Sequence, residues 1–503
     1  MNRPFHFSFR LSTPAAMLAL AVVSGPVAAA FNSGSTGADG AFNPSVTSTV
    51  TLPESGILNY TTVNIPAGVT VTFKKNTTNT PVVLLASGNV TIAGSIDVSG
   101  GGSTNTGAAG NGAIGDDGIP GVGGPGGYAG GRGGSVNSIG GPGLGPGGGS
   151  PGKQECSYSS YYDGAGGGGF AGQGGARYAN SSCISAPGGP AYGAASLLPL
   201  IGGSGGGGGF GGYSFVGTGG GGGGGALLIA SSGTINIAGG IWANGGNSGS
   251  SSGVGCGTGG GGGSGGAIRL VATTISGNGT LSAAGGGGGN AASGGANSSL
   301  ACMGDYYYSN GGGDGSAGRI RLEAENFTRT AGSNPGHSFG APGPVFISGM
   351  PSLKITSVAG QAVPDAPTGV GDVSLPSTTA NPVTVTFATT GVPVGNTIKL
   401  TVTPTNGAVT SAISPALVGD STAATASVAI TLPTGPSSLL ATVTYTVVVS
   451  MGDALSVYAA NERVESVTLL AGLGGGEAKA ILRTVSGKEF TVPASVLARA
   501  AAG

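Results

Sequence analysis

Two clusters of tyrosines are the residues best suited to binding. The clusters consist of Tyr158, Tyr161 and Tyr162, and of Tyr306, Tyr307 and Tyr308. A tyrosine presents a flat apolar ring and a hydroxyl group, which suits a sugar ring or a protein partner. Both clusters lie in glycine-rich sequence, so the rings could instead cover backbone that has no side chains of its own. The sequence leaves both interpretations open.

A cysteine precedes each tyrosine cluster. The four cysteines of the chain are Cys156, Cys183, Cys256 and Cys302. They lack the short C-x-x-C spacing of zinc sites, and an even number of cysteines fits an oxidising compartment. Proximity in the sequence favours the pairs Cys156–Cys183 and Cys256–Cys302. Such disulfides would order the tyrosine loops and lower the entropic cost of binding.

Carboxylates that could carry acid–base chemistry are scarce. Asp116 and Asp117 are adjacent, and neighbours on an extended chain point to opposite faces, so we expect a solvated turn there. Glu323 and Glu325 share one face of a predicted strand beside two arginines. That pattern is typical of a surface ladder of charges. These two carboxylates are nevertheless the best candidates for polysaccharide lyase or hydrolase chemistry.

Histidine is almost absent from the chain. Of the two histidines, only His337 lies beyond the N-terminal segment. This excludes a multi-histidine metal site, and a Ser-His-Asp triad would have to use His337. Matches to G-x-G-x-x-G arise by chance in a chain this rich in glycine. We therefore predict no catalytic residue, no metal and no cofactor.

The composition excludes several classes of protein. Glycine accounts for 112 of the 503 residues, against a typical share of ~7%. Charged residues make up 7% and the net charge is −1, so there is no positive surplus to bind nucleic acid. The charge is too low for a solvated disordered chain, and the glycines lack the strict three-residue period of collagen.

The N-terminal segment has the features of a secretory signal. Arg3 and Arg10 supply positive charge, residues 15–23 are apolar, and residues 28–30 are all alanine. Small residues of this kind mark a cleavage site, so we expect cleavage after Ala30. The apolar run is far shorter than the ~20 residues that span a bilayer. We expect a secreted or extracellular protein, with attachment at the outer cell surface as an option and no membrane span.

Four apolar segments repeat along the first two-thirds of the chain. They cover residues 81–100, 225–245, 266–285 and, in degenerate form, 318–330. Each contains two short runs of alternating apolar residues around a glycine turn, which predicts half-buried strands. One such unit cannot bury its apolar face alone, but stacked units can. We predict an all-β fold in which residues 31–345 form a right-handed parallel β-helix, rather than a β-sandwich.

Glycine tracts separate the repeats. The insertions fall at about residues 101–224, 246–265 and 286–317. Flexible linkers are one interpretation. Close packing of extended polyglycine helices is the other, because only glycine lets backbones approach so closely. Cysteines and aromatic residues within the tracts favour the packed lobe.

The sequence of residues 31–345 resembles a known class of proteins. The resemblance is carried by residues 60–73 (YTTVNIPAGVTVTF) and 81–100 (PVVLLASGNVTIAGSIDVSG). These segments are similar to the secreted, glycine-rich, pectin-lyase-like parallel β-helix surface proteins of Gram-negative bacteria. The resemblance implies architecture and location, and no characterised activity.

The composition changes near residue 345. Strand patterns at residues 383–389, 397–403, 424–432 and 441–449 predict an immunoglobulin-like β-sandwich over residues 346–450. Residues 451–503 carry more charge, with a predicted hairpin around Ser486 and Gly487. We expect either a separate C-terminal extension or a continuation of the sandwich.

Three functions remain after these exclusions. The first is a non-enzymatic surface or matrix protein for adhesion or scaffolding, which binds an extracellular glycan or a surface protein and could self-associate. The second is a polysaccharide lyase or hydrolase that uses Glu323 and Glu325. The third is an ice- or crystal-binding protein, which needs a regular threonine array. Thr70 and Thr72 begin such an array, but later repeats do not continue it.

Overall fold

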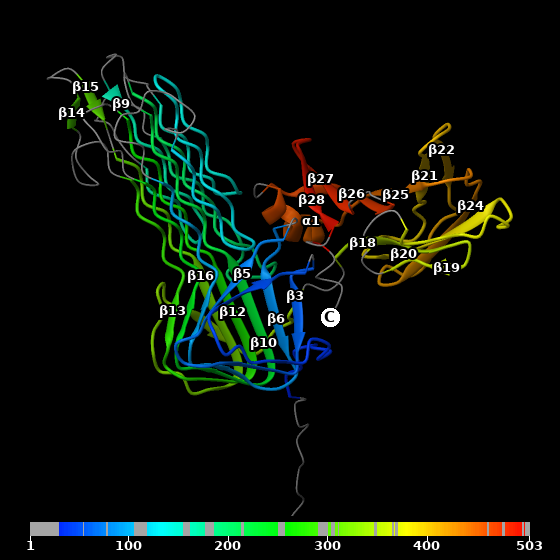
Figure 1. Ribbon diagram of the computed structural model, residues 1–503, viewed down its shortest axis with the longest axis horizontal. Helices are drawn as coiled ribbons and strands as arrows, with labels where there is room; N and C mark the ends of the chain where they lie inside the picture. The colour runs from blue at the N-terminus through cyan, green and yellow to red at the C-terminus, as the bar shows by residue number, and fades with distance from the viewer. Residues whose placement is uncertain are drawn as a thin grey trace, which may run out of the picture. The chain divides into compact units, whose positions relative to one another are not determined.

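The regular secondary structure of the computed structural model is almost entirely β-strand, so the all-β expectation is confirmed (Figure 1). Its described residues include one α-helix, α1 (Val449–Leu455), and one 3-10 helix, η1 (Ser456–Tyr458). No helix in this part of the chain is long and apolar enough to cross a membrane.

The structure describes most of the chain beyond the predicted signal. The described residues are 30–53, 55–76, 79–104, 118–153, 161–176, 186–212, 216–249, 257–289, 300–302, 307–309, 311–346, 350–364, 367, 371–459, 462–474, 478–494 and 497. The predicted signal sequence before Ala30 lies outside them, as does the pair Asp116 and Asp117.

The first large sheet has nine strands, and all of its pairings are parallel. Its main path runs through β1 (Ala41–Phe42), β4 (Thr62–Ile65), β7 (Val90–Ile92), β10 (Ala226–Ile237), β12 (Ala267–Ser276), β16 (Arg319–Phe327) and β17 (Ser338–Gly340). Beside this path, β6 (Val82–Ala86) pairs with β3 (Ile57–Tyr60) and with β10.

A second sheet has five strands and is also parallel. Its strands are β2 (Ser48–Thr51), β5 (Thr70–Lys74), β8 (Ser95–Asp97), β11 (Gly240–Trp242) and β13 (Thr280–Ser282). The chain visits the two sheets alternately: β4 is followed by β5, β7 by β8, β10 by β11, and β12 by β13. Each of these four passes of the chain, a pass being one strand of the first sheet and the strand that follows it in the second, therefore adds a strand to both sheets.

The predicted repeats set the register of these sheets. Ile237 pairs with Ile92, and Ile241 pairs with Ile96. All four side chains are buried in one apolar cluster that both sheets share. Alternating residues of a strand face opposite sides, so the alternation found in the sequence supplies the inward faces of both sheets.

Glycines stack at the corner between the two sheets. A Cβ on Gly239 would lie 1.7 Å from the carbonyl oxygen of Gly94, and one on Gly279 would lie 2.1 Å from that of Gly239. No side chain can be placed at such distances. The turn glycines of the repeats are therefore required by the close contact between successive passes.

The described parts of the glycine tracts pack against one another. In residues 205–211, every third amide donates to the same neighbouring segment, in the pairs Gly205–Leu144, Gly208–Gly141 and Gly211–Ser138. The intervening amides bond to other segments, for example Gly206 to Gly221 and Gly207 to Gly166. A three-residue period is the period of an extended left-handed helix. These backbone bonds replace the side-chain packing that glycine lacks.

Residues 350–497 form antiparallel sheets around a core of their own. One sheet comprises β18 (Ser352–Val358), β19 (Gln361–Ala362), β20 (Val383–Thr390), β23 (Val418–Gly419) and β24 (Ala424–Ile430). The other comprises β21 (Lys399–Pro404), β22 (Thr410–Ile413), β25 (Ser437–Thr446), β26 (Val464–Leu473), β27 (Lys479–Thr484) and β28 (Glu489–Pro493).

The strands after residue 450 continue the second of these sheets. β26 pairs with β25, and β27 and β28 form the hairpin that the sequence predicted. The boundary expected at residue 451 therefore falls inside one sheet. The higher charge of residues 451–503 gave no indication that their strands join the sheet. The relevant feature is the alternation of buried apolar residues, such as Val467, Leu469 and Leu482.

Candidate functional site

Residues of the two tyrosine clusters meet in a small sheet of three strands (Figure 1, upper left). The strands are β9 (Tyr161–Tyr162), β14 (Leu300–Cys302) and β15 (Tyr307–Ser309). β9 and β15 are parallel, with Tyr161 opposite Tyr308, while β14 and β15 are antiparallel, with Cys302 opposite Tyr307. We call this element the tyrosine sheet.

Backbone hydrogen bonds in the glycine tracts connect the segments that follow β9 and β15 to the rest of the chain. The amide of Asp163, directly after β9, donates to the carbonyl of Lys153 (3.1 Å). The amide of Gly313, just after the second cluster, donates to the carbonyl of Ala165 (2.8 Å). The packed glycine segments thus bring together two clusters that are remote in the sequence.

Several predicted site residues lie outside the described part of the chain. These are Tyr158, Tyr306, Cys156, Cys183 and Cys256. Cys302 is described by its backbone in β14. The two proposed disulfides therefore stay predictions, while the backbone pairing of the two clusters is a structural finding.

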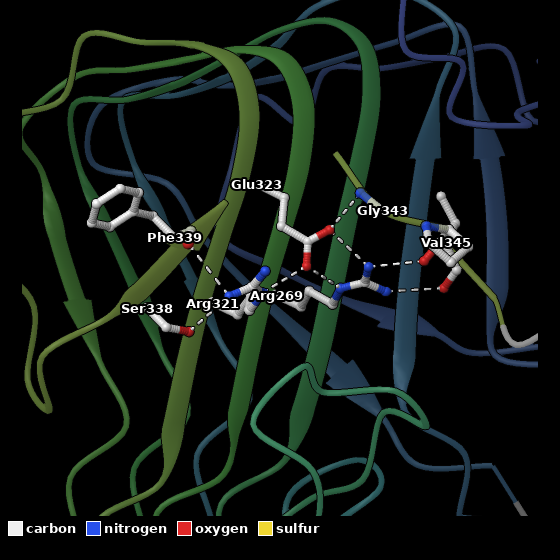
Figure 2. A network of polar contacts seen from close by, with 8 residues as sticks. Arg269, Arg321, Glu323, Ser338, Phe339, Gly343 and Val345 are labelled. Carbon is white, nitrogen blue, oxygen red and sulfur yellow. Dashed lines mark hydrogen bonds and ion pairs between the residues drawn. The ribbon is translucent and has the colours of Figure 1, made fainter. Parts of the chain in front are cut away.

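The carboxylate of Glu323 lies in a buried network with two arginines (Figure 2). Its Oε2 atom is 2.9 Å from Nη2 of Arg269, and its Oε1 atom is 2.9 Å from Nε of Arg321. Gly343 donates its amide to Oε2 at 2.9 Å. Arg269 is fully buried and also donates to the carbonyls of Pro344 (2.8 Å) and Val345 (3.2 Å).

The network keeps Glu323 ionised. Burial acts to raise the pKa of its carboxyl group, but the hydrogen bonds and charge of Arg269 oppose this, aided by the hydrogen bonds from Arg321 and Gly343. The net result is a pKa below the ordinary value. A general acid needs a raised pKa, so this carboxylate is suited to anchoring structure rather than to donating a proton.

Glu325 is placed quite differently from Glu323. It is exposed, and its Oε1 atom accepts a hydrogen bond from the backbone amide of Phe31 at 2.7 Å. One carboxylate of the pair is thus enclosed with arginines, while the other accepts a hydrogen bond from the amide of Phe31. The arrangement does not provide two free carboxylates facing one substrate.

His337 has a serine partner. Its Nδ1 atom lies 2.9 Å from the hydroxyl oxygen of Ser333. Burial lowers the pKa of His337, as does the nearby charge of Arg329. Among the described residues, no carboxylate hydrogen-bonds to this histidine, so the orienting member of a catalytic triad is missing there.

Metal ligands do not gather in the described part of the chain. No group of three or more His, Cys, Asp or Glu residues is placed there to hold a metal ion. The threonine array is also interrupted. Thr49 and Thr72 share a hydrogen bond of 2.8 Å, but the next register positions are occupied by Asp97 and Trp242.

Arg269 is the residue of the network that the sequence reasoning missed. A signal for it was present, because it is a charged residue inside the apolar run of the third repeat, AIRLVA. The matching position of the fourth repeat is Arg321, and the two are in register in β12 and β16. Arg269 is fully buried, and a buried charge requires a partner, which Glu323 supplies.

Comparisons with family models, curated proteins and solved structures gave no match.

Proposed function

We propose that this is a secreted, non-enzymatic surface or matrix protein that binds extracellular glycans through its tyrosine sheet. The observation that carries the proposal is the pairing of Tyr161 with Tyr308 across β9 and β15. Residues at matching register positions of adjacent strands share one face of a sheet. The register thus brings together two residues of a type that offers an apolar ring and a hydroxyl group, and such residues suit stacking on sugar rings.

The architecture that we propose for this function has two parts. A right-handed parallel β-helix carries polyglycine helices that display the tyrosine sheet, and an immunoglobulin-like sandwich acts as a spacer. Alternating parallel strands in residues 41–340 support the first part. The three-residue period of the glycine hydrogen bonds supports the polyglycine helices. Antiparallel sheets around one core support the sandwich.

Two observations favour binding over catalysis. The buried ion pairs of Glu323 leave it no free proton-transfer role, and Glu325 is in contact with the amide of Phe31. A glycan-binding surface needs neither carboxylate. Export fits the predicted signal sequence, which places the protein where it would meet polysaccharides.

A polysaccharide panel tests the proposal. The mature protein is incubated with immobilised polysaccharides, and both the protein retained and the soluble sugar released are measured. We expect retention without release. Release of soluble sugar by the purified wild-type protein would overturn the non-enzymatic function. Absence of both retention and release would overturn glycan binding and favour a protein partner or self-association.

A further inference from the structure

The first residue after the predicted cleavage site has a carboxylate partner. The backbone nitrogen of Phe31 donates to Oε1 of Glu325 at 2.7 Å. Glu325 is exposed, and in the described part of the chain it forms no ion pair with lysine or arginine. A charged acceptor is thus satisfied here by a neutral peptide amide.

The chain is anchored from Phe31 onward. Alternate residues of β6, β10 and β12 form a small apolar cluster on the face of the first sheet that points away from the main core. This outer-face cluster consists of Val83, Leu85, Leu228, Ala230 and Val271. The ring of Phe31 packs against it, while the preceding residue, Ala30, is exposed.

Ser33 adds a second anchor two residues further along. It is 1% exposed, and its hydroxyl donates to the carbonyl of Ala86 at 2.7 Å. Its amide donates to the hydroxyl of Ser232 at 3.0 Å. These contacts anchor the residues that follow the nitrogen of Phe31, and that nitrogen lies beside β16 through its contact with Glu325.

Cleavage between Ala30 and Phe31 would change the chemistry of that nitrogen. A peptidase that recognises small residues before the bond, and uses water as co-reactant, breaks the carbon–nitrogen bond. Ala30 becomes a carboxylate, and the nitrogen of Phe31 becomes an amine that takes up the released protons as an ammonium group. At neutral pH the ammonium form predominates, because an α-amino group has an ordinary pKa of about 7.7–8.0.

We propose that processing after Ala30 creates an ion pair between the α-ammonium group of Phe31 and the carboxylate of Glu325. The proposal rests on the export included in the proposed function. Before cleavage the two residues share a hydrogen bond between a neutral amide and a carboxylate. After cleavage the same atoms carry opposite charges, and a charge-assisted hydrogen bond is stronger than one from a neutral donor. Only the mature chain therefore has the complete contact.

The neighbouring charges leave Glu325 available for this role. Glu323, on the same strand, is already paired with Arg269 and Arg321. Glu323 thus has two cationic partners, whereas Glu325 has none among the described residues. Glu325 is the acceptor to which the structure directs it.

The first measurement is the N-terminus of protein exported from a Gram-negative host. Intact mass and N-terminal sequencing are expected to show a chain that begins at Phe31. Any other N-terminus overturns the inference. An uncleaved chain retained in the cytoplasm would also overturn the export on which the proposed function depends.

A double-mutant cycle then tests the ion pair. The two changes are Glu325→Gln and retention of the three alanines 28–30, which restores a peptide amide at Phe31 and moves the ammonium group away. We expect Glu325→Gln to raise the unfolding equilibrium constant of the mature chain roughly two- to fivefold, and to have a clearly smaller effect when the alanines are present.

Glu465→Gln is the matched control, because it removes an exposed carboxylate from β26. It is expected to have the same effect in both chains. Equal effects of Glu325→Gln in both chains would overturn the ion pair, even with cleavage after Ala30. That result would not affect glycan retention, so the ion-pair proposal can fail while the proposed glycan binding stands.

Discussion

Arg269 and Glu323 form a buried ion pair, with 2.9 Å between Nη2 and Oε2 and side chains that are 0% and 3% exposed. The pair joins β12 to β16 on the outer side of the first sheet, and it holds the segment at Gly343–Val345 through the hydrogen bonds in Figure 2. Removing one partner leaves an uncompensated buried charge, which is costly.

We expect Glu323→Gln to lower the free energy of unfolding by about 3–5 kcal/mol. The measurement is urea unfolding followed by the fluorescence of Trp242, the single tryptophan of the chain, which lies in β11 of the second sheet. Glu325→Gln is the control, and an exposed carboxylate there is worth at most about 1 kcal/mol. Similar losses for both variants would contradict the structural role of Glu323.

Acid is expected to weaken the same contact. The folded pKa of Glu323 lies below its ordinary value, so its contribution is fully present above the unfolded pKa of about 4.3. That contribution is lost as the pH falls through the lower, folded pKa. The stability of the wild type and of Glu323→Gln should therefore converge as the pH falls below about 4. A constant difference between their Trp242 unfolding curves from pH 7 to pH 3 would contradict this.

Glycine packing predicts strong position dependence for alanine substitution. A Cβ on Gly208 would lie 1.9 Å from the carbonyl oxygen of Arg132, whereas a Cβ on Gly172 meets nothing within 4 Å. Gly208→Ala is expected to cost roughly 1–3 kcal/mol, because the packed segments must move apart. Gly172→Ala should change stability by no more than about 0.5 kcal/mol. Equal tolerance at both positions, read from thermal unfolding, would show that the tracts are not packed in solution.

Tyr161→Ala and Tyr308→Ala are each expected to weaken glycan retention at least about tenfold, since aromatic residues dominate such contacts. Retention is measured as binding isotherms on the polysaccharide that the panel identifies. Phe339→Ala is the control, because Phe339 is 73% exposed and would reveal non-specific adhesion through aromatic rings. Undiminished retention in both tyrosine variants, with unchanged Trp242 fluorescence, would place the binding surface elsewhere.

Local sequence patterns were sufficient to predict many of the strands. The alternation that places Ile92 and Ile96 inward recurs at Ile237 and Ile241, and these residues pair in register in the structure. The strand predicted at residues 383–389 corresponds to β20, and the predicted hairpin to β27 and β28. These features are predictable because strand periodicity and turn glycines act between residues that are near one another in the sequence.

The tertiary structure alone decided which distant segments meet. One glycine string resembles another, so the sequence could not show that Gly208 would bond to Gly141, or that Tyr161 would lie opposite Tyr308. The tertiary structure likewise paired Arg269 with Glu323 and gave Glu323 and Glu325 different environments, although the alternation placed both on one face of a strand. Backbone hydrogen bonds and buried charges are satisfied by whichever partner the complete packing brings within reach. Local periodicity contains no information about that choice.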